Sequence, residues 1–326
     1  AQNLFREFAQ KEVKPLACEV DENEAFPRAT VDKLMKFGFM GIPVPKQLGG
    51  QGCDTLTYEL CVEEMAKACA TTSAIISAHT SLCCDPLINF GSEEQKQKFL
   101  VPLASGQKLG AFALTEPGAG TDAAGQQTKA VPDGDAYVLN GTKIFITNGK
   151  EADYYIVFAM TDKSKGTHGI SAFIVEKGTP GFTFGTKEKK MGIRGSSTYE
   201  LIFSDCKIPK ENLLGREGKG FGIAMQTLDG GRIGIAAQAL GIAEGAFERT
   251  VTYVKERKQF GRTLANFQNT QFVLADMATR IEAARYLVYK AAIAKDTQNR
   301  FSTEAAMAKL YAAERLRSHQ LRKPEA

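Results

Sequence analysis

One glycine-rich segment of the sequence has residue types that could hold a cofactor. Residues 111–123, AFALTEPGAGTDA, join an apolar run to a loop. Because glycine has no side chain, Gly118 and Gly120 allow backbone amides to approach a ligand closely. Thr115 and Thr121 add hydroxyl groups that can donate and accept hydrogen bonds. The segment is a candidate cofactor loop, and an ordinary glycine-rich turn is the alternative.

The spacing of Gly118, Gly120 and Ala123 also matches the dinucleotide fingerprint G-x-G-x-x-A. That fingerprint places the pyrophosphate at the N-terminus of a helix, so a helix must follow the glycines. Here Pro132 and Gly134 follow, and no apolar helical pattern separates them from the loop. We therefore do not predict a Rossmann site.

A second candidate segment, residues 143–149 (KIFITNG), reads as the end of a strand. Phe145 and Thr147 are two positions apart and so share one face of that strand. On that face, the phenyl ring could cover a flat ligand ring while the hydroxyl group bonds to its edge. Packing of both side chains in a core is the alternative.

The third candidate lies in a long apolar helical pattern that contains the turn Leu228 to Arg232. Its adjacent glycines, Gly230 and Gly231, each cost a helix about 1 kcal/mol relative to alanine, which indicates that something packs closely there. Asp229 and Arg232 are one helical turn apart, so a local ion pair is the alternative to ligand binding.

Farther along, Arg257 and Gln268 flank Phe260-Gly261, a predicted turn between two helices. An arginine in such a place suits a phosphate group, although most surface arginines are simply solvated.

Composition narrows the classes of function. The 326 residues include 41 basic and 37 acidic side chains, a net charge of +4, so we predict no nucleic-acid partner. With 43% hydrophobic and 24% charged residues, the chain is neither disordered nor fibrous. The seven cysteines form no C-x-x-C pair, which predicts reduced thiols and no metal site. The sequence shows neither an export signal nor a membrane span, and we expect the bacterial cytoplasm, or the mitochondrial matrix in a eukaryote.

Three zones must position these candidates, and together they predict an α+β fold. Residues 1–107 have helical periodicity, residues 108–210 consist of short β-type runs, and residues 211–314 return to helices. We expect an N-terminal helical domain, a middle antiparallel β-domain with a hairpin turn at Asn140-Gly141, and a C-terminal helical domain. Residues 315–326 form an atypical basic tail with four basic side chains against one acidic.

Four motifs in this order resemble the acyl-CoA dehydrogenase family, most of all its short-chain, butyryl-CoA branch, from Ala1 to about Glu314. They are LTEPGAGTD (114–122), NGTKIFITN (140–148), MGIRGSS (191–197) and QTLDGGRIG (226–234). The resemblance implies FAD as cofactor, an acyl-CoA substrate and a homotetramer built from two dimers. The residues that it assigns to FAD are Phe112, Leu114, Thr115, Gly120, Thr121, Phe145, Ile146, Thr147, Arg257 and Gln268, the last two reaching an FAD held mainly by a neighbouring subunit. Those that it assigns to the CoA thioester are Thr121, Asp229, Gly230, Gly231 and Arg232.

The family reaction, by the same resemblance, converts an acyl-CoA to the trans-2-enoyl-CoA. A glutamate removes the α-proton, the β-hydrogen leaves as hydride to the flavin, and the electrons pass to an electron-transfer flavoprotein. An acyl-CoA oxidase, which passes the electrons to O₂, is one alternative. A catalytically silent protein that binds flavin or acyl-CoA is the other.

The sequence departs from the family at the catalytic base. The short-chain branch carries its glutamate in a Tyr-Glu-Gly motif near the C-terminus, and no such motif is present. Other branches place the base at the position that aligns with Gly231, which has no side chain. The Gly-Gly-x-Gly-Tyr segment is also missing. We therefore name no catalytic residue, expect a truncated C-terminus, and predict little or no dehydrogenase activity for the chain as given.

Overall fold

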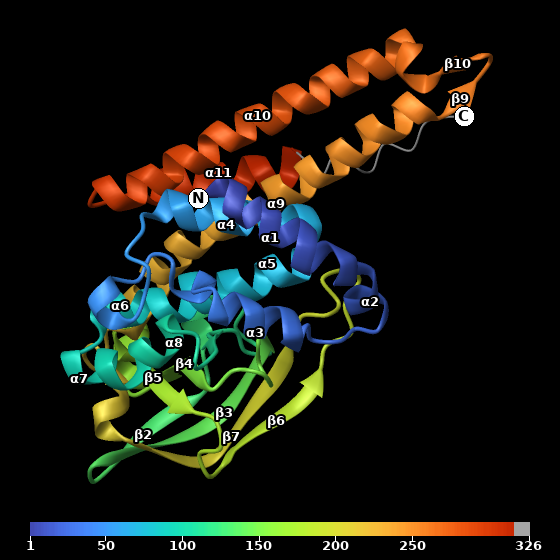
Figure 1. The fold of residues 1–326 in the computed structure, drawn as a ribbon. Coiled ribbons are helices and arrows are strands. Elements are labelled where there is room, and N and C mark those ends of the chain that lie inside the picture. Colours follow the sequence, from blue (N-terminus) through green and yellow to red (C-terminus); the bar gives the residue numbers. More distant parts are fainter. Residues whose placement is uncertain (316–326) are drawn as a thin grey trace. The chain divides into compact units, whose positions relative to one another are not determined.

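The computed structural model describes residues 1–315, which divide into two compact units (Figure 1). The first unit comprises residues 1–17, residues 54–74 and the chain from Arg232 onward, and the second comprises residues 18–53 and 75–231. Each unit is described by itself. The domain limits at 107 and 210 remain predictions, and the basic tail after Arg315 lies outside the described residues.

Helices build the first unit. They are α1 (Gln2–Phe8), α4 (Thr55–Ala68), the start of α5 (Ala70–Ser77), the later turns of α9 (Gly220–Glu256), α10 (Gln268–Thr297) and α11 (Ser302–Leu310). Asp54 caps α4 by accepting a hydrogen bond from the Thr57 amide at 2.8 Å. At Gly241 in α9, an added Cβ would lie 2.3 Å from the backbone oxygen of Glu63 in α4. Gly241 therefore permits close approach of the α4 backbone to α9.

The second unit combines short helices with a sheet. The helices are α2 (Ala17–Glu22), α3 (Arg28–Lys36), α6 (Asp85–Phe90), α7 (Glu93–Gln95) and α8 (Val101–Ala104). The strands are β1 (Gly110–Ala113), β2 (Lys129–Asp133), β3 (Ala136–Ile146), β4 (Tyr154–Met160), β5 (Ile170–Glu176), β6 (Phe182–Lys187), β7 (Tyr199–Pro209) and β8 (Leu213–Leu214). A further two-stranded ribbon, β9 (Lys258–Gln259) with β10 (Arg262–Thr263), belongs to the first unit.

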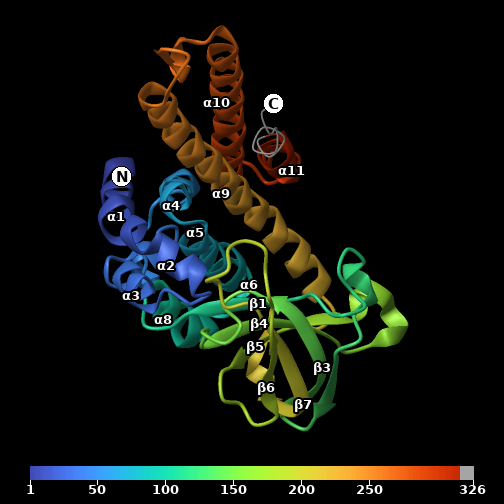
Figure 2. The same ribbon diagram turned by 90° about the vertical axis from the view of Figure 1, so that its right-hand side faces the viewer.

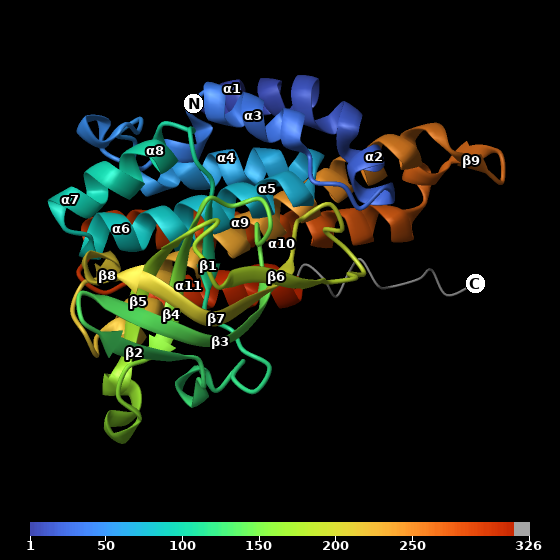
Figure 3. The ribbon, with the colours of Figure 1, turned by 90° about the horizontal axis from the view of Figure 1, so that it is seen from below.

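The sheet is largely antiparallel, with the order β6-β7-β3-β2-β4-β5-β8. Strand β3 lies between β2 and β7, and β6 borders β7 (Figures 2 and 3). Strand β1 pairs with β4 in parallel, and β2 meets β4 in parallel at a single pair. The sheet is thus mixed, and β1 delivers the glycine-rich loop from beside the buried strand β4.

Apolar cores lie on both faces of β4. Ile156 and Phe158 pack into a core shared with α6, α8 and the start of α9, whereas Tyr155 and Val157 pack into a core enclosed by the other strands. Successive side chains of a strand point to opposite faces, so an unbroken apolar run fits this position. A rigid, doubly buried strand therefore supports the loop that follows β1.

The predicted hairpin at Asn140-Gly141 is wrong, because β3 runs straight through it. The actual turn lies at Gly134, which has a φ of 61° between β2 and β3. At Gly141 the register with β7 shifts, and an added Cβ would lie 2.6 Å from the Thr128 backbone. The Asn140 side chain bonds to Asp205 across the strands. Tertiary crowding, and not a turn, therefore requires this glycine.

Helix α11 begins one residue earlier than an N-cap at Ser302 would place it. Phe301 precedes the first helical residue, which is Ser302 itself. Glu304 does lie in the first turn, where its charge complements the helix dipole.

Candidate active site

The glycine-rich loop presents an open, polar surface. Nothing lies within 4 Å of a Cβ added at Gly118 or Gly120. The backbones of Glu116 and Ala119 exchange two hydrogen bonds of 3.1 Å, which fold the loop into a tight turn. Among the described residues, no protein acceptor takes the amide hydrogens of Gly120 and Thr121, and both residues are exposed. The loop thus offers backbone donors to a ligand. The segment that follows it is a short 3-10 turn, Ala123–Gly125, and not the helix that a Rossmann site requires, which agrees with the rejection of such a site.

Lys143 of β3 crosses from the sheet to this loop. Its fully buried ammonium group donates to the backbone oxygen of Leu114 at 3.0 Å, to Glu116 Oε1 at 2.7 Å and to Gln126 Oε1 at 2.9 Å. An ammonium group has three protons, and all three are used. The next residue adds a backbone bond, from the Ile144 amide to the oxygen of Thr115 at 2.9 Å.

Glu116 completes the network from the loop side. Besides Lys143, it accepts hydrogen bonds from the amides of Gln127 at 2.6 Å and Thr128 at 3.1 Å. Burial acts to raise the pKa of Glu116, but the ammonium group and these donors outweigh it and hold the pKa below its ordinary value. Burial lowers the pKa of Lys143 to about 8, although Glu116 opposes this shift. At neutral pH the two form a buried ion pair.

Strand β3 changes course directly after Lys143. The register with β7 shifts between Lys143 and Ile146, as in a β-bulge. Phe145 adopts a left-handed φ of 60° and leaves its side chain 58% exposed, while Ile146 is buried. The exposure contradicts core packing for Phe145. Aromatic residues adopt this φ at an energetic cost, and such strain collects at functional sites.

Asn148 ends the same bulged segment, also with a left-handed φ, of 62°. Its buried side-chain amide donates to the backbone oxygens of Gly110 at 3.2 Å and Ile75 at 3.3 Å, whereas its Oδ1 has no hydrogen-bond partner. Asn148 therefore fixes the segment that contains Thr147 against the start of β1. Phe112, in β1, packs its ring 5.0 Å from that of Phe158.

The turn Asp229 to Arg232 lies in the uninterrupted helix α9. A Cβ added at Gly231 would lie 2.6 Å from Cδ2 of Leu82. The prediction that something packs closely at these glycines is thus confirmed at Gly231, where the neighbour is a leucine side chain of the second unit. Any side chain at position 231 would have to displace Leu82.

Arg257 and Gln268 lie at the far end of the first unit, on either side of the β9-β10 ribbon. The ribbon is closed by a bond of 2.9 Å from the Leu264 amide to the Arg257 oxygen. Both side chains are exposed, and Gln268 is the first residue of α10. The structure thus places the predicted residues in three groups. The first, the loop-and-bulge cluster of the second unit, comprises those from Phe112 to Thr121 and from Phe145 to Thr147. The second is the helix turn on α9, and the third is this exposed corner.

Sequence reasoning missed Lys143 and Glu116 as members of the cluster. The available signal was the lysine itself, which stands among Ile144, Phe145 and Ile146 in a run that otherwise fits a buried strand. Buried lysines are rare unless they are paired.

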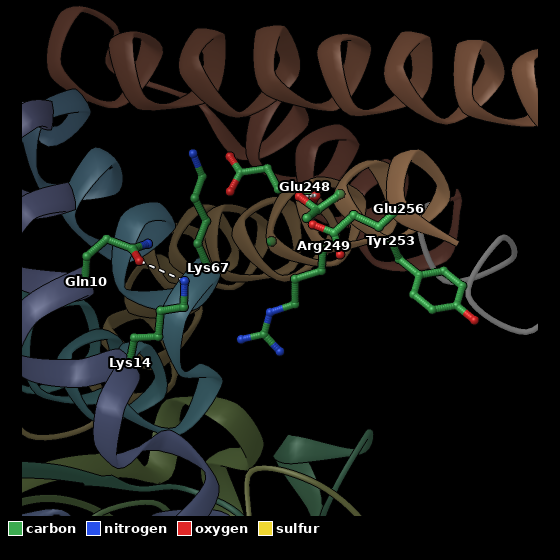
Figure 4. A pocket seen from close by; sticks show the side chains of 9 residues that line it. Gln10, Lys14, Lys67, Glu248, Arg249, Tyr253 and Glu256 are labelled. Carbon is green, nitrogen blue, oxygen red and sulfur yellow. Dashed lines mark hydrogen bonds between the residues drawn. The ribbon is translucent and has the colours of Figure 1, made fainter. Parts of the chain in front are cut away.

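A polar pocket of about 410 Å³ opens on the first unit between the start of the chain and the later turns of α9 (Figure 4). Cationic Lys14 and Arg249 and anionic Glu248 and Glu256 line it together, and Lys14 donates to Gln10 at 3.0 Å. None of the predicted site residues lines this pocket. Within residues 1–315, no cluster of His, Cys, Asp and Glu is arranged to hold a metal ion, and no helix is long and apolar enough to cross a membrane.

Comparison with known proteins agrees with the motifs. Family models match residues 1–107 (acyl-CoA dehydrogenase, N-terminal domain), 111–206 (middle domain) and 218–319 (C-terminal domain). The short-chain specific acyl-CoA dehydrogenase of Clostridium acetobutylicum is 60% identical over 310 residues, which cover 95% of this chain and 82% of that protein.

Solved structures agree as well. Butyryl-CoA dehydrogenase from Megasphaera elsdenii superimposes with a TM-score of 0.95 at 55% identity, over 97% of this chain and 85% of that one. A chain in a structure described as the electron transferring flavoprotein of Acidaminococcus fermentans gives a TM-score of 0.95 at 59% identity, over 96% of this chain and 82% of that one. With its three domain matches and its helical, β and helical segments in the family's order, the chain belongs to the acyl-CoA dehydrogenase family.

Proposed function

We propose that the chain binds FAD and short-chain acyl-CoA thioesters for α,β-dehydrogenation to the trans-2-enoyl-CoA, with butyryl-CoA as the representative substrate. The observation that carries the proposal is the loop-and-bulge cluster, in which an open glycine loop is bonded to a strained strand end with an exposed phenyl ring. The 60% identity to a short-chain specific relative supports the acyl length.

The residues of the cluster fit FAD. The free amides of Gly120 and Thr121 and the side chains of Thr115 and Thr147 suit the polar edge of an isoalloxazine ring, and exposed Phe145 suits its face. Phe112, Leu114 and Ile146 would line the apolar side. When bound, FAD supplies the acceptor for the β-hydrogen, and the protein supplies position and electrostatics.

The thioester is proposed to lie against Thr121 and the α9 turn formed by Asp229, Gly230, Gly231 and Arg232. Hydrogen-bond donors aimed at the thioester carbonyl would stabilise the enolate charge that develops as the α-proton leaves. Gly230 and Gly231 are buried and Leu82 packs against Gly231, so Asp229 and Arg232 are the partly exposed residues that this turn would offer to a ligand.

Proton abstraction needs a carboxylate at the α-carbon, and these 326 residues offer none at the family's positions. Loss of a general base lowers a rate by a factor of about 10² to 10⁴. We therefore propose that a polypeptide of these residues binds flavin and acyl-CoA but dehydrogenates slowly.

Anaerobic bleaching of the bound flavin by butyryl-CoA tests both parts. We expect slow bleaching by the wild-type chain and faster bleaching when a base is supplied by Gly231→Glu together with Leu82→Ala, which clears the space that Leu82 fills. Gly231→Glu alone is the comparison, because it shows how much of the effect needs the space that Leu82 fills. Fast bleaching by the wild type would contradict the missing base. A wild type that binds no FAD would contradict the proposed function, and peroxide release in air would favour an oxidase.

The proposed electron acceptor is an electron-transfer flavoprotein, and the proposed assembly is a homotetramer. Relatives that support the acceptor include the caffeyl-CoA reductase-Etf complex subunit CarC of Acetobacterium woodii, at 50% identity. Helix α10 supports the assembly, since it exposes Phe272, Tyr286 and Ile293 at 64%, 68% and 50%. Arg257 and Gln268 would then reach an FAD of a neighbouring subunit. Light scattering of the purified protein measures the assembly, and a monomer would contradict it.

A further inference from the structure

We propose that Lys143, with Glu116 as its counter-ion, is a positioning residue that locks the glycine-rich loop and the bulged end of β3 into one rigid receptor for the flavin. The inference rests on the proposed function, because it concerns how the cofactor segments are held. Neither residue needs to touch the ligand.

The first step of the argument is where the three bonds of Lys143 end. Leu114 lies where the loop leaves β1, Glu116 lies inside the loop, and Gln126 lies where the loop returns toward β2. One ammonium group therefore ties the start, the middle and the end of the loop to one point on the sheet. Between these points the loop is ordered by its own backbone bonds between Glu116 and Ala119, and nothing packs within 4 Å of a Cβ added at Gly118 or Gly120.

The second step is where Lys143 stands in its own strand. It is the last residue of β3 in regular register before the shift that exposes Phe145. The adjacent Ile144 amide binds Thr115 of the loop. The same two residues of β3 thus hold the loop on one side and the strained segment on the other, and movement of either would move both.

The third step is energetic. A buried lysine loses its hydration, and the depressed pKa of Lys143 reflects that cost. A buried ion pair is often no more stabilising than apolar residues of similar volume, so stability alone is a weak reason for one at this place. Its hydrogen bonds are directional, however, and they define a single loop geometry in a way that apolar contacts do not.

The test compares FAD binding with folding in the apoprotein. Lys143→Met with Glu116→Gln removes both charges and so avoids a lone buried one. Gln126→Met is a milder variant that removes one acceptor and keeps the ion pair. Lys207→Met is the matched control, since it removes a lysine paired at 2.7 Å with Asp133 on the same sheet, where both partners are about 60% exposed.

Three quantities are measured: the FAD dissociation constant by fluorescence quenching, the absorption spectrum of bound flavin, and amide hydrogen exchange. For the double variant we expect FAD binding about tenfold weaker, a shifted flavin spectrum, and faster exchange confined to residues 114–128 and 144–148. Gln126→Met should weaken binding about threefold, and Lys207→Met should change nothing.

The inference fails if the wild type binds FAD and the double variant binds it equally well with the same spectrum. It also fails if exchange rises evenly across the sheet, because that marks a general loss of stability. If the double variant does not fold, Gln126→Met decides, and unchanged FAD binding in that variant overturns the inference. A wild type that binds no FAD contradicts the proposed function instead, so the two failures are distinguishable.

Discussion

Glu116 and Glu59 are both buried carboxyl groups, yet their surroundings give them opposite charge states. Glu116, in the loop of the second unit, meets an ammonium group and two amides, and its pKa is lowered. Glu59, on α4 of the first unit, is 1% exposed, its Oε2 has no hydrogen-bond partner, and burial raises its pKa to about 8. Donors within reach, together with the depth of burial, decide whether a carboxyl group ionises.

The difference separates a group that organises a site from one that only occupies a core. The charged form of Glu116 orders the backbone on both sides of the loop. Neutral Glu59 orders nothing comparable, although the same helix carries Glu63, which does meet Arg285 and Tyr289. A buried carboxyl group is therefore a candidate for a functional role when its hydrogen-bond partners belong to a ligand-binding segment whose conformation it fixes.

The largest expected effect is that of Lys143→Met alone, which would strand Glu116 as an unpaired buried charge. We expect a loss of about 3 to 5 kcal/mol in the free energy of unfolding, measured by urea denaturation at pH 7. The exposed control Lys207→Met should cost less than about 1 kcal/mol. A loss for Lys143→Met as small as the control would show that Glu116 is not held charged by this pair.

Glu59→Gln should raise the free energy of unfolding, in contrast to Lys143→Met. The pKa of Glu59 is higher in the folded protein, about 8, than its ordinary 4.5, so the folded state keeps a proton that the unfolded state releases. This contribution to stability is present below about pH 4.5 and is lost as pH rises toward 8. The glutamine variant should therefore be more stable than the wild type by on the order of 2 kcal/mol at pH 8.

The same pair of proteins provides the control at pH 5, where folded Glu59 is already neutral. There the two melting temperatures should nearly coincide. A difference that is constant from pH 5 to pH 8 would mean that Glu59 is not the titrating group.

Phe145→Gly probes the strain beside the ion pair. Glycine adopts the φ of 60° without a Cβ clash, and the exposed phenyl ring loses little burial, so apoprotein stability should rise by about 1 kcal/mol. FAD affinity should fall, because the ring that would cover the flavin is gone. Thermal unfolding and FAD titration of the same sample measure both, and a gain in affinity would contradict the assigned role of Phe145.

The smallest effect is a pH dependence of FAD binding. Folded Lys143 releases its proton near pH 8, whereas the unfolded lysine keeps it to about 10.5. Between these values the contribution of Lys143 to global stability rises with pH, while the loop loses its charged donor. We expect FAD affinity to fall about threefold from pH 7 to pH 9, unaffected by Glu59→Gln. If FAD affinity instead rose with pH, as the stability contribution of Lys143 does, the proposed effect of its charge on the loop would be refuted.

Much of the fold was predictable because local patterns dictate it. The long apolar helix predicted around Leu228 to Arg232 is α9, and the β-type runs predicted in residues 108–210 include the doubly buried strand β4. Strands β2 and β6 escaped prediction. Lys129 to Asp133 contains Pro132 and is exposed at most positions, so it lacks the usual signature of a strand. The predicted turn at Asn140-Gly141 was wrong because a glycine can be required by close packing of a neighbouring backbone as well as by a turn.

The candidate site was predictable in part. Its loop and its bulged strand end were identified from glycine, hydroxyl and aromatic residues, which are local signals. The bonds of Lys143 to Leu114, Glu116 and Gln126 connect residues 17 to 29 positions apart, and no local pattern encodes them. The assignments of individual residues to FAD and the thioester remain predictions that the experiments above address.

The contact between Leu82 and Gly231 bears on how substitutions at these two positions combine. A side chain introduced at 231 meets the end of the Leu82 side chain, which must shift to make room, and a small residue at 82 leaves a hole beside the helix. The effect of a substitution at 231 therefore depends on the residue at 82, and the two positions are epistatic.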